Sequence, residues 1–209
     1  KYLFLDESGS IGAELIVVGL LVSTPYLNDK ISRAIRGIMD GQNSLNQEIP
    51  RNRTLRASTS QPELRRDVIQ RLADKPILVQ ARVLEPPLPQ GLDGNDAYNA
   101  LVALAIGDCV ERHGDIHAVL HKRYTSLTLT ARLEKTIVTE VARRKRRLLS
   151  LTHTHLLSRR WGYQLVAADN IVWAVHRKLA HGDSALYDSI SNRIEPGGER
   201  RITTGEILQ

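Results

Sequence analysis

The chain has 209 residues, of which 42% are hydrophobic but only 4% aromatic. This length suits one substantial domain, and a core of mainly aliphatic side chains is typical of helix-rich α/β proteins. The net charge of +6 is compatible with a nucleic-acid partner. Cys109 is the single cysteine, which excludes a disulfide within the chain, and no apolar run reaches membrane-spanning length. We therefore expect a cytoplasmic protein without membrane contact.

Two strands are predicted at the start of the chain. The first covers residues 1–6 and leads into two acids, Asp6 and Glu7, whereas the second covers the apolar residues 14–23. The segment between them contains Gly9 and suits a hairpin connection. A helix is then predicted to start at Asn28 or Asp29, which can cap it, and to run to about residue 40.

Helices and strands alternate in the rest of the chain. The apolar spacing predicts helices at about 62–72, 96–113, 127–143 and 164–180, and strands at 77–84, 116–120 and 148–153. A hairpin followed by helix-linked strands implies an α/β fold, with a mixed five-stranded sheet and helices on both faces. We expect a single domain over residues 1–194 and a loose C-terminal tail over residues 195–209, which includes Pro196.

Acids at the ends of predicted elements form the first candidate site. If the strand at 116–120 lies parallel beside the first strand, His121 emerges at the same edge of the sheet as Asp6. Asp169 lies in an otherwise apolar helix, where it either favours the helix N-terminus or converges with Asp6 on a metal ion. Asp6 and Asp169 are thus the predicted metal ligands, with Glu7 and His121 as further catalytic candidates. The alternative for Asp6 and Glu7 is a plain turn.

Basic residues form three clusters along the sequence. They are three arginines between residues 51 and 56, a pair directly after His121, and a run of five cations from residue 143. Such a run repels itself unless solvent or a polyanion is close, and it would neutralise phosphates well. The alternative is a solvated helix end. The candidates for nucleic-acid binding are Arg51, Arg53, Arg56, Lys122, Arg123, Arg143, Arg144, Lys145, Arg146 and Arg147.

Two segments resemble a known family. The opening Tyr-Leu-Phe-Leu-Asp-Glu-Ser-Gly-Ser and the later Ala-Asp-Asn-Ile-Val-Trp-Ala-Val-His-Arg-Lys are similar to motifs of the domain-of-unknown-function 3800 family. That family is bacterial and is regarded as having an RNase H-like fold. The resemblance implies a metal-dependent nuclease using Mg²⁺ or Mn²⁺, with Asp6 and Asp169 matching the family's first and last acids.

Two positions depart from the family pattern. Thr54 stands where the family has a glutamate, and His121 stands where an aspartate is usual. Two carboxylates with phosphate oxygens can hold one ion, whereas a two-metal site normally needs more negative charge. His121 could ligate Mn²⁺ or act as a general base, and Glu7 or Glu48 could replace the missing acid.

Two functions therefore remain open on the sequence. The first is a metal-dependent nuclease that hydrolyses phosphodiester bonds of DNA or RNA. The second is a catalytically degenerate subunit that keeps the fold and binds nucleic acid or another protein. Neither a Gly-x-Ser-x-Gly motif nor a phosphate-binding loop is present, which disfavours serine hydrolysis and P-loop chemistry. The sequence also leaves open DNA versus RNA and a homodimer.

Overall fold

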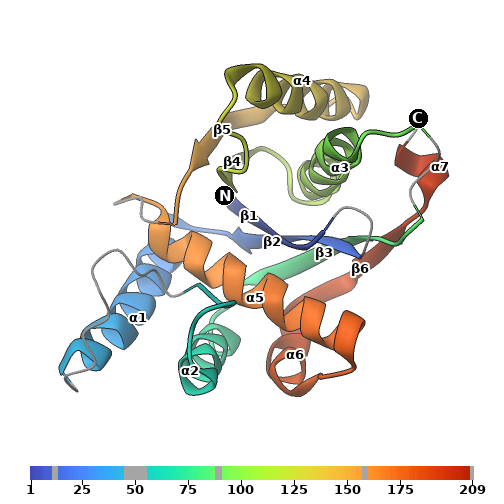
Figure 1. The fold of residues 1–209 in the computed structure, drawn as a ribbon. Coiled ribbons are helices and arrows are strands. Elements are labelled where there is room, and N and C mark those ends of the chain that lie inside the picture. Colours follow the sequence, from blue (N-terminus) through green and yellow to red (C-terminus); the bar gives the residue numbers. More distant parts are fainter. Residues whose placement is uncertain (11–13, 45–55, 88–90, 157–159, 208–209) are drawn as a thin grey trace.

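A computed structural model describes residues 1–10, 14–44, 56–87, 91–156 and 160–207. At its centre is one mixed sheet with the strand order β5-β4-β1-β2-β3-β6 (Figure 1). Strands β1, β2 and β3 form an antiparallel meander, β4 and β5 continue the sheet parallel to β1, and β6 lies parallel to β3. The strands are β1 (Tyr2–Gly9), β2 (Leu15–Val22), β3 (Leu78–Leu84), β4 (Ile116–His121), β5 (Leu148–Thr154) and β6 (Ile194–Ile202).

Helices cover both faces of the sheet (Figure 1). One face packs against α1, α2, α5 and α6, and the other packs against α3 and α4. The helices are α1 (Pro25–Ser44), α2 (Pro62–Ala73), α3 (Gly94–His113), α4 (Leu127–Arg143), α5 (Gly162–His181), α6 (Ala185–Ile190) and the short α7 (Thr204–Ile207). The predicted cap of the first helix was wrong: α1 starts earlier, and the Thr24 hydroxyl accepts from the amide of Leu27.

Side chains of β1 alternate between two hydrophobic clusters. Leu3 and Leu5 pack in the cluster with α3 and α4, whereas Phe4 packs in the cluster with α5. The same period of two directs Asp6 toward the α5 face and Glu7 toward the α3 face. The fold therefore places two neighbouring acids on opposite faces of β1.

The expected α/β architecture with an RNase H-like mixed sheet is confirmed, because β1 to β5 have the order and directions of that fold. The expectation of five strands and a loose tail from residue 195 needs correction. Strand β6 pairs with β3, and Ile202 is buried. The strand was not predicted because Pro196 and the glycines after it are uncommon inside strands. They are tolerated here because β6 is an edge strand and its pairing with β3 is irregular.

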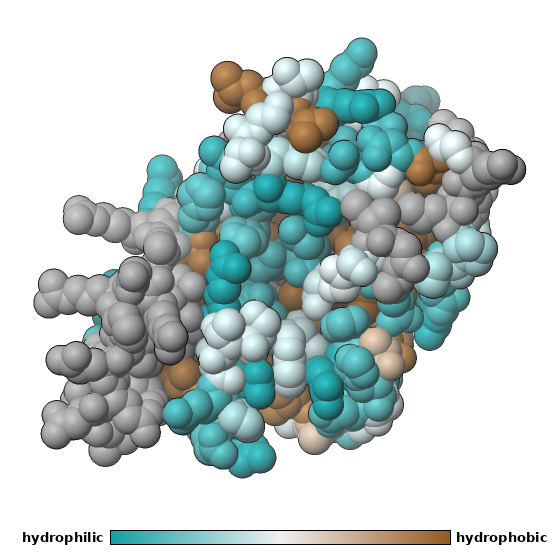
Figure 2. Space-filling model, viewed as in Figure 1, coloured by the Kyte–Doolittle hydropathy of each residue, from teal (hydrophilic) through white to brown (hydrophobic). Residues whose placement is uncertain are grey.

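The surface seen from the side of Figure 1 is mostly hydrophilic, and its hydrophobic patches are small and separate (Figure 2). In the described part of the chain, no helix combines the length and the apolar character that crossing a membrane requires.

Candidate functional site

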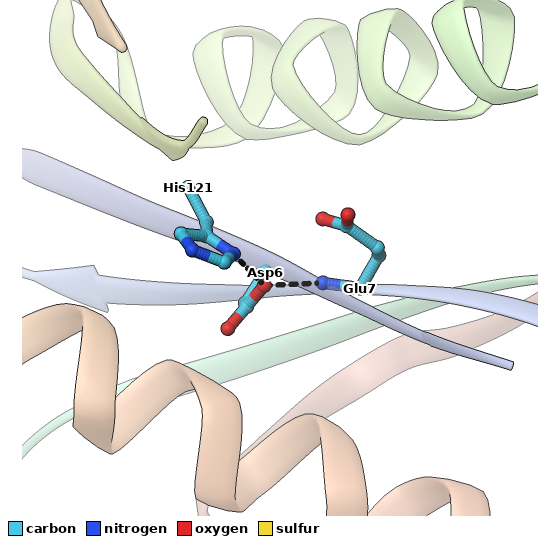
Figure 3. A group of neighbouring side chains, drawn as sticks. All are labelled: Asp6, Glu7 and His121. Atoms are coloured by element: carbon cyan, nitrogen blue, oxygen red, sulfur yellow. Dashed lines mark hydrogen bonds and ion pairs between the residues drawn. The ribbon is translucent and has the colours of Figure 1, made fainter. Parts of the chain in front are cut away.

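The site begins where the parallel pairing of β1 with β4 ends: β4 stops at His121, whereas β1 continues to Gly9 beside β2. Leu5 of β1 pairs with Leu120 of β4, so the next residues, Asp6 and His121, emerge together. His121 Nδ1 lies 3.1 Å from Asp6 Oδ1 (Figure 3), and Asp6 is only 4% exposed. The sequence predicted this juxtaposition for neighbouring parallel strands. A buried aspartate and an imidazole are thus held at one edge of the sheet.

Glu7 joins this pair from the other face of β1. Its backbone amide donates to Asp6 Oδ1 at 2.9 Å, while its carboxylate points away from that of Asp6 (Figure 3). The Tyr98 hydroxyl and the Arg123 guanidinium donate to the Glu7 carboxylate at 3.4 and 3.5 Å. Asp6, Glu7 and His121 each offer a ligand atom, and these atoms all lie within 4.8 Å of one another. We call these three residues the acid cluster.

Asp169 borders the acid cluster from α5. Its Oδ2 accepts a hydrogen bond of 2.7 Å from the backbone amide of Ala57. It is close enough to Asp6 for the two negative charges to interact, but it is not one of the three residues whose ligand atoms converge within 4.8 Å. The structure therefore groups Asp6 with Glu7 and His121, and Asp169, which the sequence paired with Asp6, lies beside this group.

Charge is poorly balanced around these carboxylates. Burial, together with the charge of Asp6, raises the pKa of Glu7 to about 7, although Arg123 and His121 oppose the shift. Burial and Asp6 likewise raise the pKa of Asp169 to about 6. Burial disfavours the His121 imidazolium, but its hydrogen bond to Asp6 and the nearby negative charges outweigh that cost and raise the pKa of His121. Protonation of these carboxylates or binding of a cation would therefore stabilise the site.

This imbalance makes the stability of the metal-free protein depend on pH. Because folding raises the pKa of Glu7 from an ordinary 4.5 to about 7, the stabilisation by protonated Glu7 is full below pH 4.5 and is lost as pH rises through 7. Glu7→Gln keeps a neutral side chain there at every pH. We expect it to raise the free energy of unfolding by about 1–3 kcal/mol at pH 8 and to change it little near pH 4.5.

Denaturant unfolding in EDTA at the two pH values measures this difference. Glu63→Gln on the exposed side of α2 is the matched control and should shift neither value. A loss of stability in Glu7→Gln at pH 8, or an equal change at both pH values, would contradict the charge imbalance.

Some predicted basic residues lie at the edge of the sheet that carries the acid cluster. Arg56 is exposed and its charge acts on both Asp169 and His121. Lys122 is exposed directly after β4, and Arg123 reaches Glu7. These three cations lie near the acid cluster. The predicted Arg51 and Arg53, together with Glu48 and Thr54, lie outside the described residues.

The basic run at 143–147 lies elsewhere. It enters β5 beside the start of β4, whereas His121 lies at the other end of the β4–β5 pair, about 20 Å away for seven residues of strand. Arg144 bonds to Asp108 at 2.8 Å and Glu140 at 2.6 Å and also contacts Glu111. The run therefore lies apart from the acid cluster, and its binding to nucleic acid stays a prediction. The carboxylates that engage Arg144 come from α3 and α4, and only the packed helices bring them together.

Two contacts of the site escaped the sequence reasoning. Tyr98 fixes Glu7 from α3, and the amide of Ala57 fixes Asp169 from the segment before α2. Tyr98 lies on the buried side of α3, and a buried tyrosine needs a partner for its hydroxyl, which was the available signal. A backbone amide carries no such signal in the sequence.

No protein-family model matches this chain, and no curated protein matches it. Among solved structures, the chain is similar to one from the complex of PCNA and RNase HII of Archaeoglobus fulgidus. The identity is 15% and the TM-score 0.45, over 88% of this chain and 78% of that chain. A likeness of this extent does not identify an activity, so any functional assignment has to come from the residues of the site.

Proposed function

We propose that the protein is a metal-dependent nuclease that hydrolyses phosphodiester bonds at the acid cluster. The observation that carries this proposal is that one ligand atom each from two carboxylates of β1 and one imidazole at the end of β4 lie within 4.8 Å of one another. The motifs shared with the domain-of-unknown-function 3800 family support it, because they centre on Asp6 and on Asp169, which borders the cluster.

The side chains present fit one divalent cation. Asp6, Glu7 and His121 would hold it, and an imidazole among the ligands suits Mn²⁺ better than Mg²⁺. Burial, together with the charge of Asp6, raises the pKa values of Glu7 and Asp169, and a bound cation would offset that charge. When bound, the ion would polarise the phosphate and lower the pKa of a water molecule.

The residues of the chain then have separable tasks. His121 must release the proton that its hydrogen bond to Asp6 favours, so proton and metal compete for the same pair. Tyr98 and Arg123 hold the Glu7 carboxylate in place. Asp169, which borders the cluster from α5, would accept a proton from the attacking water.

A second function is favoured by one specific contact. The His121–Asp6 hydrogen bond satisfies Asp6 without a metal ion, and His121 stands where the resembled family has an acid. A nucleic-acid-binding subunit that has lost catalysis would keep this pair as a structural element. Arg56, Lys122 and Arg123 would then bind phosphates without cleavage.

Single-turnover cleavage of end-labelled DNA and RNA, each single-stranded and duplex, separates the two functions. We expect cleavage with Mn²⁺, weaker cleavage with Mg²⁺ and none in EDTA. Salt-sensitive binding without cleavage under any of these conditions would support the second function. Neither binding nor cleavage would overturn both.

A further inference from the structure

A pocket of about 480 Å³ lies among α2, α5 and α6. Three arginines and a tryptophan line it, and Asp183 is the one acid among the lining residues. We call it the Trp173 pocket. Its volume lies within the range of small-ligand sites, and its charged lining residues sum to a positive charge. The residues that the argument uses are Arg65, Arg66, Trp173, Arg177 and Asp183.

Two arginine side chains of this pocket lie against the indole ring of Trp173. The Arg65 guanidinium lies 4.2 Å from the Trp173 ring centroid, and that of Arg177 lies 5.6 Å from it. Burial, with the charge of Arg177, lowers the pKa of Arg65. Arg177 pairs with Asp183 at 3.1 Å, whereas Arg66 is exposed and has no ion pair recorded within the described ranges. The pocket therefore contains the flat ring of Trp173 and three arginine charges, of which the single lining carboxylate, Asp183, can neutralise only one.

The Trp173 pocket lies near Asp169, which borders the acid cluster. Trp173 follows Asp169 by one turn of α5, which is about 6 Å along the helix axis. The backbone of Ala57 joins the two regions, because its carbonyl accepts from Arg65 Nη1 at 2.6 Å and its amide donates to Asp169 at 2.7 Å. A chain of nucleotides with one phosphate at the acid cluster would thus have the pocket as its next neighbour.

We propose that the Trp173 pocket binds an unpaired nucleotide of single-stranded nucleic acid, next to the phosphate that the acid cluster receives. The position next to a phosphate at the acid cluster rests on the proposed function, whereas binding of a nucleotide in the pocket does not. Indole and guanidinium faces stack on bases irrespective of sequence, and arginine forks bind phosphate oxygens. A single strand fits better than a duplex, because a paired base is held inside its own stack and cannot enter a concave site.

Fluorescence of Trp173 reports occupation of the pocket directly. The chain has two tryptophans, so Trp161→Phe leaves Trp173 as the single indole. Titration of this variant with a 12-residue oligothymidylate or oligouridylate in EDTA should quench the emission. Arg66→Gln and Arg177→Gln should each weaken binding about fivefold and flatten the salt dependence by about one phosphate contact. Arg33→Gln on α1, which also breaks an exposed ion pair, is the matched control and should bind normally.

The outcomes separate this inference from the nuclease proposal. Quenching without cleavage in Mn²⁺ would support nucleotide binding in the pocket and would contradict the nuclease proposal. Cleavage with an unchanged KM in Arg66→Gln and Arg177→Gln would support the nuclease proposal and contradict nucleotide binding in the pocket. The absence of quenching would also contradict nucleotide binding in the pocket. Equal binding of a duplex, or equal competition by polyglutamate, would overturn the assignment to single-stranded nucleic acid.

Discussion

Replacing Asp6 by asparagine is expected to lower metal-dependent cleavage at least about 100-fold. A metal ion supplies several kcal/mol of transition-state stabilisation, and each ~1.36 kcal/mol corresponds to a factor of ten. Asp6 is buried at the centre of the acid cluster, where it bonds to both His121 and the amide of Glu7. Asparagine keeps the size of the side chain and can still accept from that amide, so the change removes charge rather than shape.

A second measurement tests the same change without activity. The hydrogen bond and negative charge of Asp6 contribute to the raised pKa of His121, so that pKa should fall in Asp6→Asn when followed by NMR titration. Direct Mn²⁺ binding should weaken in parallel. Asp67→Asn, on the exposed side of α2, is the matched control and should change neither quantity. Full cleavage by Asp6→Asn would place the metal elsewhere.

The position of this site was predictable because it depends on regular geometry. A hairpin followed by helix-linked strands predicts a mixed sheet, and the sequence placed His121 beside Asp6 on the condition that their strands are parallel neighbours. The pairing of β4 with β1 meets that condition. The alternation of β1 also directs Glu7 to the face opposite Asp6, and this too follows from the sequence once the strand is accepted.

The details that depend on packing were not predictable. How near Asp169 comes to Asp6 depends on where α5 packs along the sheet, which the sequence does not show. Strand β6 was missed because Pro196 is a poor strand residue except at an edge. Trp173 and Arg177 stand four residues apart, a spacing that allows contact on one helix face, but Arg65 reaches the same ring from α2. Only the packed helices make that pocket.

The largest effect on stability is expected from Asp108→Asn. Asp108 on α3 accepts from Arg82 Nε at 2.7 Å, and it also faces Arg144 at 2.8 Å and Arg200 at 3.6 Å. Arg82 is fully buried on β3 and donates to the Gly198 carbonyl of β6 at 2.7 Å. One carboxylate thus balances guanidinium groups from three elements. Its removal leaves the Arg82 charge buried without compensation, which costs about 3–5 kcal/mol of unfolding free energy.

Denaturant unfolding measures this loss, and a double variant explains it. Asp115→Asn removes the exposed partner of Arg147 and should cost at most about 1 kcal/mol. Combining Asp108→Asn with Arg82→Met should recover part of the stability, because Met leaves no unpaired charge in the core. Asp108 lies ten residues beyond Tyr98 on α3, about 15 Å from the acid cluster's end of that helix, so cleavage by the folded fraction should stay unchanged. A loss below about 1 kcal/mol in Asp108→Asn would show that the remaining polar groups around Arg82 suffice to hold its charge.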